Sequence, residues 1–137
     1  MKVFLDTTVL VSSFITRGLC ADIFRLILSE HELVLCPHVL KELEDILKNK
    51  INLPADQISS ILSYLKTFKI VTDHQPPMKI KLRDKSDIPV ISAALNSKSD
   101  VIVSGDKDLL EVSGHYGIKI VDPRSFFNLL KGLDKRE

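Results

Sequence analysis

Short apolar runs rich in β-branched residues alternate along the chain with longer segments of helical spacing. The runs are typical of buried parallel strands and lie at 3–5, 33–35, 69–71, 101–103 and 118–121. Between them, apolar residues recur three and four positions apart and predict helices over 21–30, 37–49, 54–68, 86–98 and 123–131. Strands that alternate with helices predict a parallel α/β sheet covered by helices on both faces.

Length and composition narrow the class of protein. The 137 residues predict a single domain over 1–137. Because 19 lysines and arginines nearly balance 18 aspartates and glutamates, any nucleic-acid binding has to be local.

Cys20 and Cys36 have no CxxC partner and are expected to pack as small apolar side chains in a reducing cytoplasm. No apolar stretch approaches the roughly 20 residues of a membrane span, and Asp6 interrupts the start too early for a signal peptide. We therefore expect a soluble cytoplasmic protein.

Two aspartates directly follow predicted strands. Asp6 comes after 3–5, and Asp106 comes after 101–103 and a Ser-Gly turn. Both are therefore expected at C-terminal strand ends, where open α/β sheets bind ligands. Either aspartate alone could instead cap the helix that follows it. Asp108 would reach the same site or stabilise the first turn of its helix.

Two further carboxylates lie on predicted helices. Asp87 falls on the apolar stripe that should face the sheet, where a carboxylate is costly unless it is neutralised, hydrogen-bonded or paired with a cation. Asp84 or Ser86 can cap that helix, which leaves Asp87 free for a functional role. Glu42 lies at the edge of another stripe, and its spacing alone does not separate a ligand from a boundary residue.

Converging carboxylates repel one another unless a cation is bound, so an acidic cluster suggests a metal. Mg²⁺ and Mn²⁺ prefer oxygen ligands and often share them with substrate phosphates. The histidines have no ligand-like spacing and argue against zinc; they are His31, His38, His74 and His115. The sequence also has no Ser/His/Asp or Cys/His constellation and no Gly-rich phosphate loop.

Four motifs together resemble the PIN domain family, small metal-dependent ribonucleases. They are FLDTTVLVSS, PHVLKELEDIL, RDKSDIPVISAAL and VSGDKDLL, and they occur in the order of the family. The closing IKIVDPRSFFNLL is similar to the last strand and helix of the family. The resemblance therefore covers essentially the whole chain.

The resemblance implies a three-layer α/β/α sandwich whose five parallel strands have the order 3-2-1-4-5. This order places Asp6 and Asp106 side by side. The resemblance also favours Glu42 over its neighbour Glu44 and implies one or two Mg²⁺ or Mn²⁺ ions. The implied catalytic and metal-binding residues are Asp6, Glu42, Asp87 and Asp106, with Asp108 as an accessory.

Other polar residues of these motifs are candidates for contacts to phosphate or to water around the metal. They are Thr7, Thr8, Ser104 and Lys107, for which surface and capping roles stay open. Thr8 stands where most members of the family have asparagine, and Lys85 stands where proline is common. Arg17, Arg83 and Lys85 either form a positive rim for RNA or are simply solvated.

Members of this size resemble VapC-like toxins of toxin–antitoxin pairs. The resemblance thus implies an endoribonuclease, an RNA substrate, a small antitoxin that covers the acidic groove, and a homodimer. One alternative is a catalytically silent PIN domain that binds RNA or protein. A haloacid-dehalogenase-type phosphatase would need a second aspartate at the position of Thr8. A receiver-type domain could use Asp73 but would need an acidic pair after the first strand.

Overall fold

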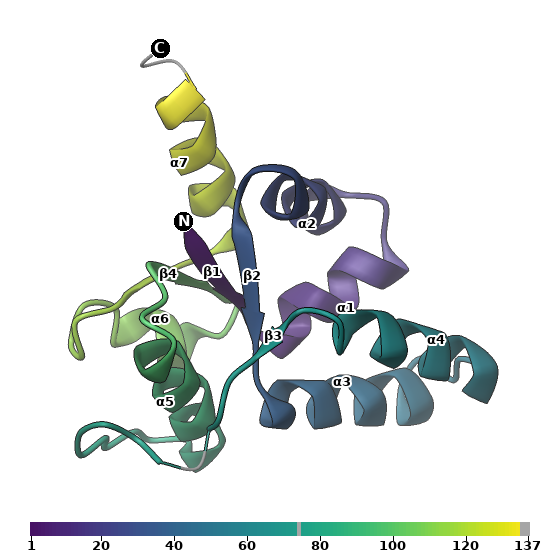
Figure 1. Cartoon of the computed structure of the whole chain (residues 1–137), viewed down its shortest axis with the longest axis horizontal. Coiled ribbons are helices and arrows are strands. Elements are labelled where there is room, and N and C mark those ends of the chain that lie inside the picture. Colours follow the sequence, from purple (N-terminus) through teal and green to yellow (C-terminus); the bar gives the residue numbers. More distant parts are fainter. Residues whose placement is uncertain (74, 135–137) are drawn as a thin grey trace.

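Five parallel strands form the centre of the computed structural model, which describes residues 1–73 and 75–134; His74 thus lies outside the described residues. In chain order, the elements are β1 (Lys2–Leu5), α1 (Thr7–Ile15), α2 (Leu19–Glu30), β2 (Glu32–Leu35), α3 (Pro37–Asn49), α4 (Ala55–Leu65), β3 (Lys69–Ile70), the 3₁₀ turn η1 (Lys85–Asp87), α5 (Ile88–Asn96), β4 (Val101–Val103), α6 (Lys107–Glu111), β5 (Lys119–Val121) and α7 (Pro123–Asp134). Every strand pair is parallel, and the strand order is β3-β2-β1-β4-β5. Figure 1 shows helices on both sides of the strands, with α5 on one side and α1 and α2 on the other. The predicted α/β fold and strand order are confirmed.

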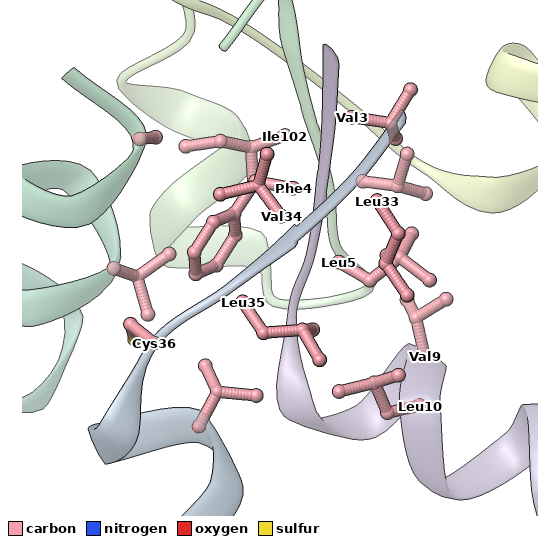
Figure 2. Packing of buried hydrophobic residues seen from close by; sticks show 14 of the residues in the cluster. Val3, Phe4, Leu5, Val9, Leu10, Leu33, Val34, Leu35, Cys36 and Ile102 are labelled. Carbon is pink, nitrogen blue, oxygen red and sulfur yellow. The ribbon is translucent and has the colours of Figure 1, made fainter. Parts of the chain in front are cut away.

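The central strands are apolar on both faces because both faces are covered. Phe4 of β1 pairs in register with Val34 and Ile102, and these three side chains lie on one side of the sheet (Figure 2). Val3 and Leu33 form the next register pair and face the other side. All five side chains are almost completely buried. Such burial explains why these strands read as continuous apolar runs instead of alternating ones.

Some element boundaries differ from those that spacing predicts. The helix predicted over 54–68 ends at Leu65, because the chain tightens into i→i+3 hydrogen bonds such as that from Phe68 N to Leu65 O at 3.1 Å. The helix predicted over 86–98 begins as η1. The spacing of apolar residues did not predict the bounds of α1 and α6. Helix α1 is apolar on most sides and shows no clear stripe, and α6 has only five residues, too few for a periodic pattern.

Asp73 has a structural role at the C-terminal edge of the sheet. Its buried carboxylate accepts a hydrogen bond from the backbone N–H of His38 at 2.8 Å, in the first turn of α3. Cys36, the N-cap residue of α3, makes no side-chain cap. The Asp73 carboxylate therefore accepts a hydrogen bond from a first-turn N–H of α3, a role that the N-cap side chain of that helix does not take.

Both cysteines are free thiols, and Cys36 is fully buried. Burial raises the pKa of Cys36 to about 12, so the thiol stays protonated and packs as an apolar group, as predicted. Within the described residues, no helix combines the length and apolar character that a membrane crossing requires.

Candidate functional site

The site begins where β1 and β4 end side by side. Leu5 pairs in register with Val103, and the backbone N–H of Asp6 donates to the Val103 carbonyl at 3.0 Å. The chain then turns into α1 after Asp6 and into α6 after Asp106, so both carboxylates lie at the same edge of the sheet. The predicted convergence of these two aspartates thus has a direct cause in the strand order.

Both aspartates also cap the helices that they precede. Asp6 Oδ1 accepts from Thr7 N at 2.8 Å, and Asp106 Oδ1 accepts from Asp108 N at 2.9 Å. The prediction that each aspartate can cap the helix after it is therefore confirmed. It uses one oxygen of each carboxylate and does not exclude a ligand role for the other oxygen.

Ser104 links the two aspartates. Its hydroxyl, with no solvent exposure, donates to Asp6 Oδ2 at 2.7 Å and accepts from the backbone N–H of Asp106 at 3.0 Å. One hydroxyl thus holds the carboxylate that follows β1 and the turn after β4 in a fixed relation. Contact of Ser104 with phosphate or with water around the metal stays a prediction, and its hydrogen bonds in the fold hold the Asp6 carboxylate and the turn at Asp106.

Burial raises the pKa of Asp6, which is only 7% exposed. The hydrogen bonds from Ser104 and Thr7 oppose this shift, and the charges of Glu42 and Asp106 add to it. The site therefore favours a positive charge beside Asp6, which would offset both the burial and the repulsion.

Glu42 reaches the same region from α3. Its Oε1 accepts from the Thr7 hydroxyl at 2.9 Å, so Thr7, like Ser104, orients a carboxylate. His38 Nε2 lies 3.2 Å from the same Oε1, one helical turn earlier. Nε2 is buried and forms no hydrogen bond within the described residues, so His38 packs against the Glu42 carboxylate without sharing a hydrogen with it.

Asp87 is buried at the junction of η1 and α5, as its place on the apolar stripe predicted, and is 7% exposed. It is the N-cap residue of α5 but makes no side-chain cap, whereas Asp84 caps η1 by accepting from Ser86 N at 2.9 Å. Burial raises the pKa of Asp87 to about 7, and the charges of Asp106, Asp84 and Asp6 contribute in that order. The burial of the Asp87 carboxylate thus costs folding free energy that no capping hydrogen bond offsets.

Asp84, Asp87 and Asp106 form a compact acidic group that could hold a metal ion. One carboxylate oxygen from each lies within 4.8 Å of the other two. Asp6 and Glu42 lie outside this group but line the same cavity of about 570 Å³, with Thr7 and Thr8. The cavity therefore gathers all four of the predicted catalytic carboxylates and adds Asp84.

The remaining predicted residues lie around this cavity. Thr8 is exposed at its wall, beside Gly105, and Lys107 is exposed in the first turn of α6. Asp108 lines a neighbouring groove of about 200 Å³, where its Oδ1 lies 3.8 Å from Arg83 Nη1. The structure thus places Asp108 beside a cation, at the edge of the acidic site.

Two residues near the site were not singled out as functional from sequence. Asp84 was considered only as a cap, although its spacing of three residues from Asp87 puts both on one turn. His38 was set aside because the histidines have no mutual ligand spacing, yet it precedes Glu42 by four residues on one helix. Both spacings can be read from the sequence, but their relation to the site becomes clear only when the fold places these residues near the other carboxylates of the cavity.

The donor set of this cavity fits a hard divalent cation. Its carboxylates are oxygen ligands of the kind that Mg²⁺ and Mn²⁺ prefer. The pKa values of Asp6 and Asp87 are both raised, mainly by burial, so these two carboxylates disfavour ionisation when no cation is beside them. A bound cation would stabilise the fully ionised form.

We expect Ser104→Ala to weaken Mn²⁺ binding by about 10- to 100-fold, because the variant removes the hydroxyl that orients Asp6 and the turn at Asp106. Titration calorimetry measures the affinity. The matched control is Ser92→Ala, which removes another buried hydroxyl, one that donates to the Ile88 carbonyl at 2.7 Å within α5. Equal affinities for the two variants would contradict the orienting role of Ser104.

Comparison with known proteins places this geometry in context. The family model described as "PIN domain" matches residues 2–108. A chain in the crystal structure of VapBC2 from Rickettsia felis, bound to a DNA fragment from their promoter, is similar in fold with a TM-score of 0.63. The two chains are 14% identical, and the match covers 89% of this chain and 98% of that one. No curated protein matches the chain.

Proposed function

Because this chain belongs to the PIN domain family, whose members are generally nucleases, we propose that it is an endoribonuclease that depends on Mg²⁺ or Mn²⁺. The observation that carries the proposal is the convergence of five carboxylates on one cavity, three of them with oxygens within 4.8 Å of one another. Such a site has little use in a protein that only binds RNA, since uncompensated carboxylates repel phosphates.

Each residue has a proposed role. Asp6, Asp87 and Asp106 would hold the cation, with Asp108 as an accessory at the edge. Asp84, which has an oxygen within 4.8 Å of those of Asp87 and Asp106, and Glu42, which lines the same cavity, would complete the set. Ser104 and Thr7 orient the carboxylates of Asp6 and Glu42 through their hydrogen bonds. A divalent cation, when bound, supplies Lewis acidity that activates water and offsets the charge that develops on the phosphodiester.

The same residues explain why the site would favour hydrolysis of a phosphodiester. The hydrogen bonds to Asp6 and Asp106 and the burial of Asp6 and Asp87 keep these carboxylates in place before substrate arrives, so little reorganisation is needed during reaction. Asp87 would ionise more readily once a cation is bound, because the cation would offset the burial and the repulsion that raise its pKa. Thr8 and Lys107, exposed beside the carboxylates, would contact the RNA phosphates.

We further propose that the protein is the toxin of a toxin–antitoxin pair and acts in the cytoplasm as a homodimer of a single domain over 1–137. The resemblance to VapC-like toxins and the similarity of fold to a chain of VapBC2 support this assignment. A small antitoxin would then inhibit the enzyme by covering the acidic cavity.

The test is titration calorimetry and thermal melting of the purified chain with Mn²⁺ and Mg²⁺, followed by incubation with a mixed-sequence single-stranded RNA library. We expect a divalent cation to bind, to raise the free energy of unfolding by about 2.7 kcal/mol at 100 times its dissociation constant, and to be required for cleavage. Absence of binding at millimolar metal, even with a nucleotide phosphate present, would favour the catalytically silent module.

A further inference from the structure

A row of exposed cations precedes the acidic cavity. Between Lys79 and Lys85 the sequence KIKLRDK places a cation at every second position, and all four cations are exposed. We define them as the basic strip: Lys79, Lys81, Arg83 and Lys85. The residues between the first three point the other way, since Ile80 is 9% exposed and Leu82 packs against the core. Exposure therefore alternates with burial from Lys79 to Arg83, and the first three cations face solvent together.

The backbone of this segment is held in place although the segment is not part of the sheet. The Tyr116 hydroxyl accepts a hydrogen bond from Lys81 N at 3.1 Å and donates one to the Lys81 carbonyl at 3.0 Å. This pair of bonds and the inward-facing apolar residues anchor the middle of the basic strip. Its cations are therefore presented from an ordered segment, which reduces the entropy lost when a ligand binds.

The basic strip leads directly to the acidic cavity. Lys81 and Arg83 line the 200 Å³ groove, and so do Asp84 and Asp87, which also line the main cavity. In Figure 1 the segment forms the loop before α5, away from the far ends of α3 and α4. A ligand that follows the cations would thus arrive beside the carboxylates that are proposed to hold the metal.

The local charge contrasts with that of the whole chain. The formal net charge of the protein is only +1, yet the seven residues from Lys79 to Lys85 hold four cations and one carboxylate. Alternate positions of an extended chain are about 7 Å apart, a spacing suited to successive phosphates of one strand. Duplex RNA, by contrast, is recognised mostly by its shape and by contacts across its wide minor groove to 2′-hydroxyls and phosphates.

We propose that the basic strip binds the backbone of single-stranded RNA and guides it into the acidic cavity. This inference rests on the proposed ribonuclease function, because it identifies the path of that enzyme's substrate. The lysines supply the electrostatic affinity. Arg83, which also contacts Asp108, lies where the strip meets the metal-binding residues.

The test compares two triple variants in a full-length chain that carries Asp106→Asn to prevent cleavage. The first is Lys79→Gln, Lys81→Gln and Lys85→Gln, and it leaves Arg83 unchanged. The matched control removes the same charge from exposed lysines around α3 and α4 and is Lys48→Gln, Lys50→Gln and Lys66→Gln. Fluorescence anisotropy measures binding of a labelled mixed-sequence single-stranded RNA over a range of salt, and thermal melting verifies that both variants fold.

We expect the strip variant to bind RNA at least about 10-fold more weakly at low salt than the control. Its plot of log affinity against log salt should be shallower by about 2, or about 0.7 for each of the three phosphates that the lysines would otherwise neutralise. Equal weakening in both variants, no weakening in either, or equally tight binding of duplex RNA would overturn the proposal. Failure of the nuclease proposal is seen separately, since metal binding by the unaltered chain does not depend on these lysines.

Discussion

Asp106→Asn is expected to abolish detectable Mn²⁺ binding and to reduce metal-dependent RNA cleavage by at least about 100-fold without unfolding the protein. Removal of groups that merely orient metal ligands costs about 10- to 100-fold, so loss of a ligand charge should cost more. The fold should survive because the asparagine oxygen can still accept the hydrogen bond from Asp108 N that caps α6. Calorimetry, melting and cleavage of the RNA library measure the three quantities.

A matched control separates the site from the general charge of the protein. Asp45→Asn removes one carboxylate from the exposed side of α3, near Glu42 in sequence but not among the residues that line the cavity. It should leave metal binding and cleavage unchanged. Retention of wild-type metal affinity by Asp106→Asn would instead mean that this aspartate serves α6 as a cap and nothing more.

Much of the site could be predicted because its residues follow strands whose apolar runs are easy to recognise. Asp6 comes directly after such a run and Asp106 comes after another and a Ser-Gly turn, and a parallel sheet brings the ends of both strands to one edge. Asp87 was found because a carboxylate on an apolar helical stripe has no simple structural explanation. Its burial and its missing cap bear out that reasoning.

The hydrogen-bond partners within the site could not be predicted from residue spacing, because they depend on contacts between distant segments. No local pattern indicates that Ser104 bonds both to a carboxylate 98 positions away and to the next turn. Likewise, the pairing of Thr7 with Glu42 needs α1 and α3 to lie side by side. Local periodicity predicts the elements and the faces that they bury, whereas the partners of small hydroxyls emerge only from the assembled fold.

Asp87→Asn is expected to stabilise the metal-free protein at pH 8 while it weakens metal binding. Burial and the surrounding aspartates raise the pKa of Asp87 from 3.8 to about 7 in the folded state. Between these values the folded protein binds more protons than the unfolded chain, so the free energy of unfolding falls as pH rises. The full shift corresponds to at most about 4 kcal/mol at 1.36 kcal/mol per pKa unit, and part of it is shared with the neighbouring carboxylates. Asparagine, which stays neutral, should escape this loss.

The decisive measurement is chemical denaturation of wild type and Asp87→Asn in EDTA from pH 4 to pH 8, and again at pH 8 with saturating Mn²⁺. The stability difference should be smallest near pH 4, close to the ordinary aspartate pKa of 3.8, and should grow in favour of the variant up to about pH 7. Mn²⁺ should then reverse the order, because only the wild type gains the free energy of metal binding. Asp45→Asn should show neither effect, since its carboxylate is exposed.

A difference independent of pH would contradict the raised pKa, and equal stabilisation of both proteins by Mn²⁺ would remove Asp87 from the proposed ligands. The expected reversal would mean that this buried carboxylate destabilises the empty fold and is compensated when the cation binds.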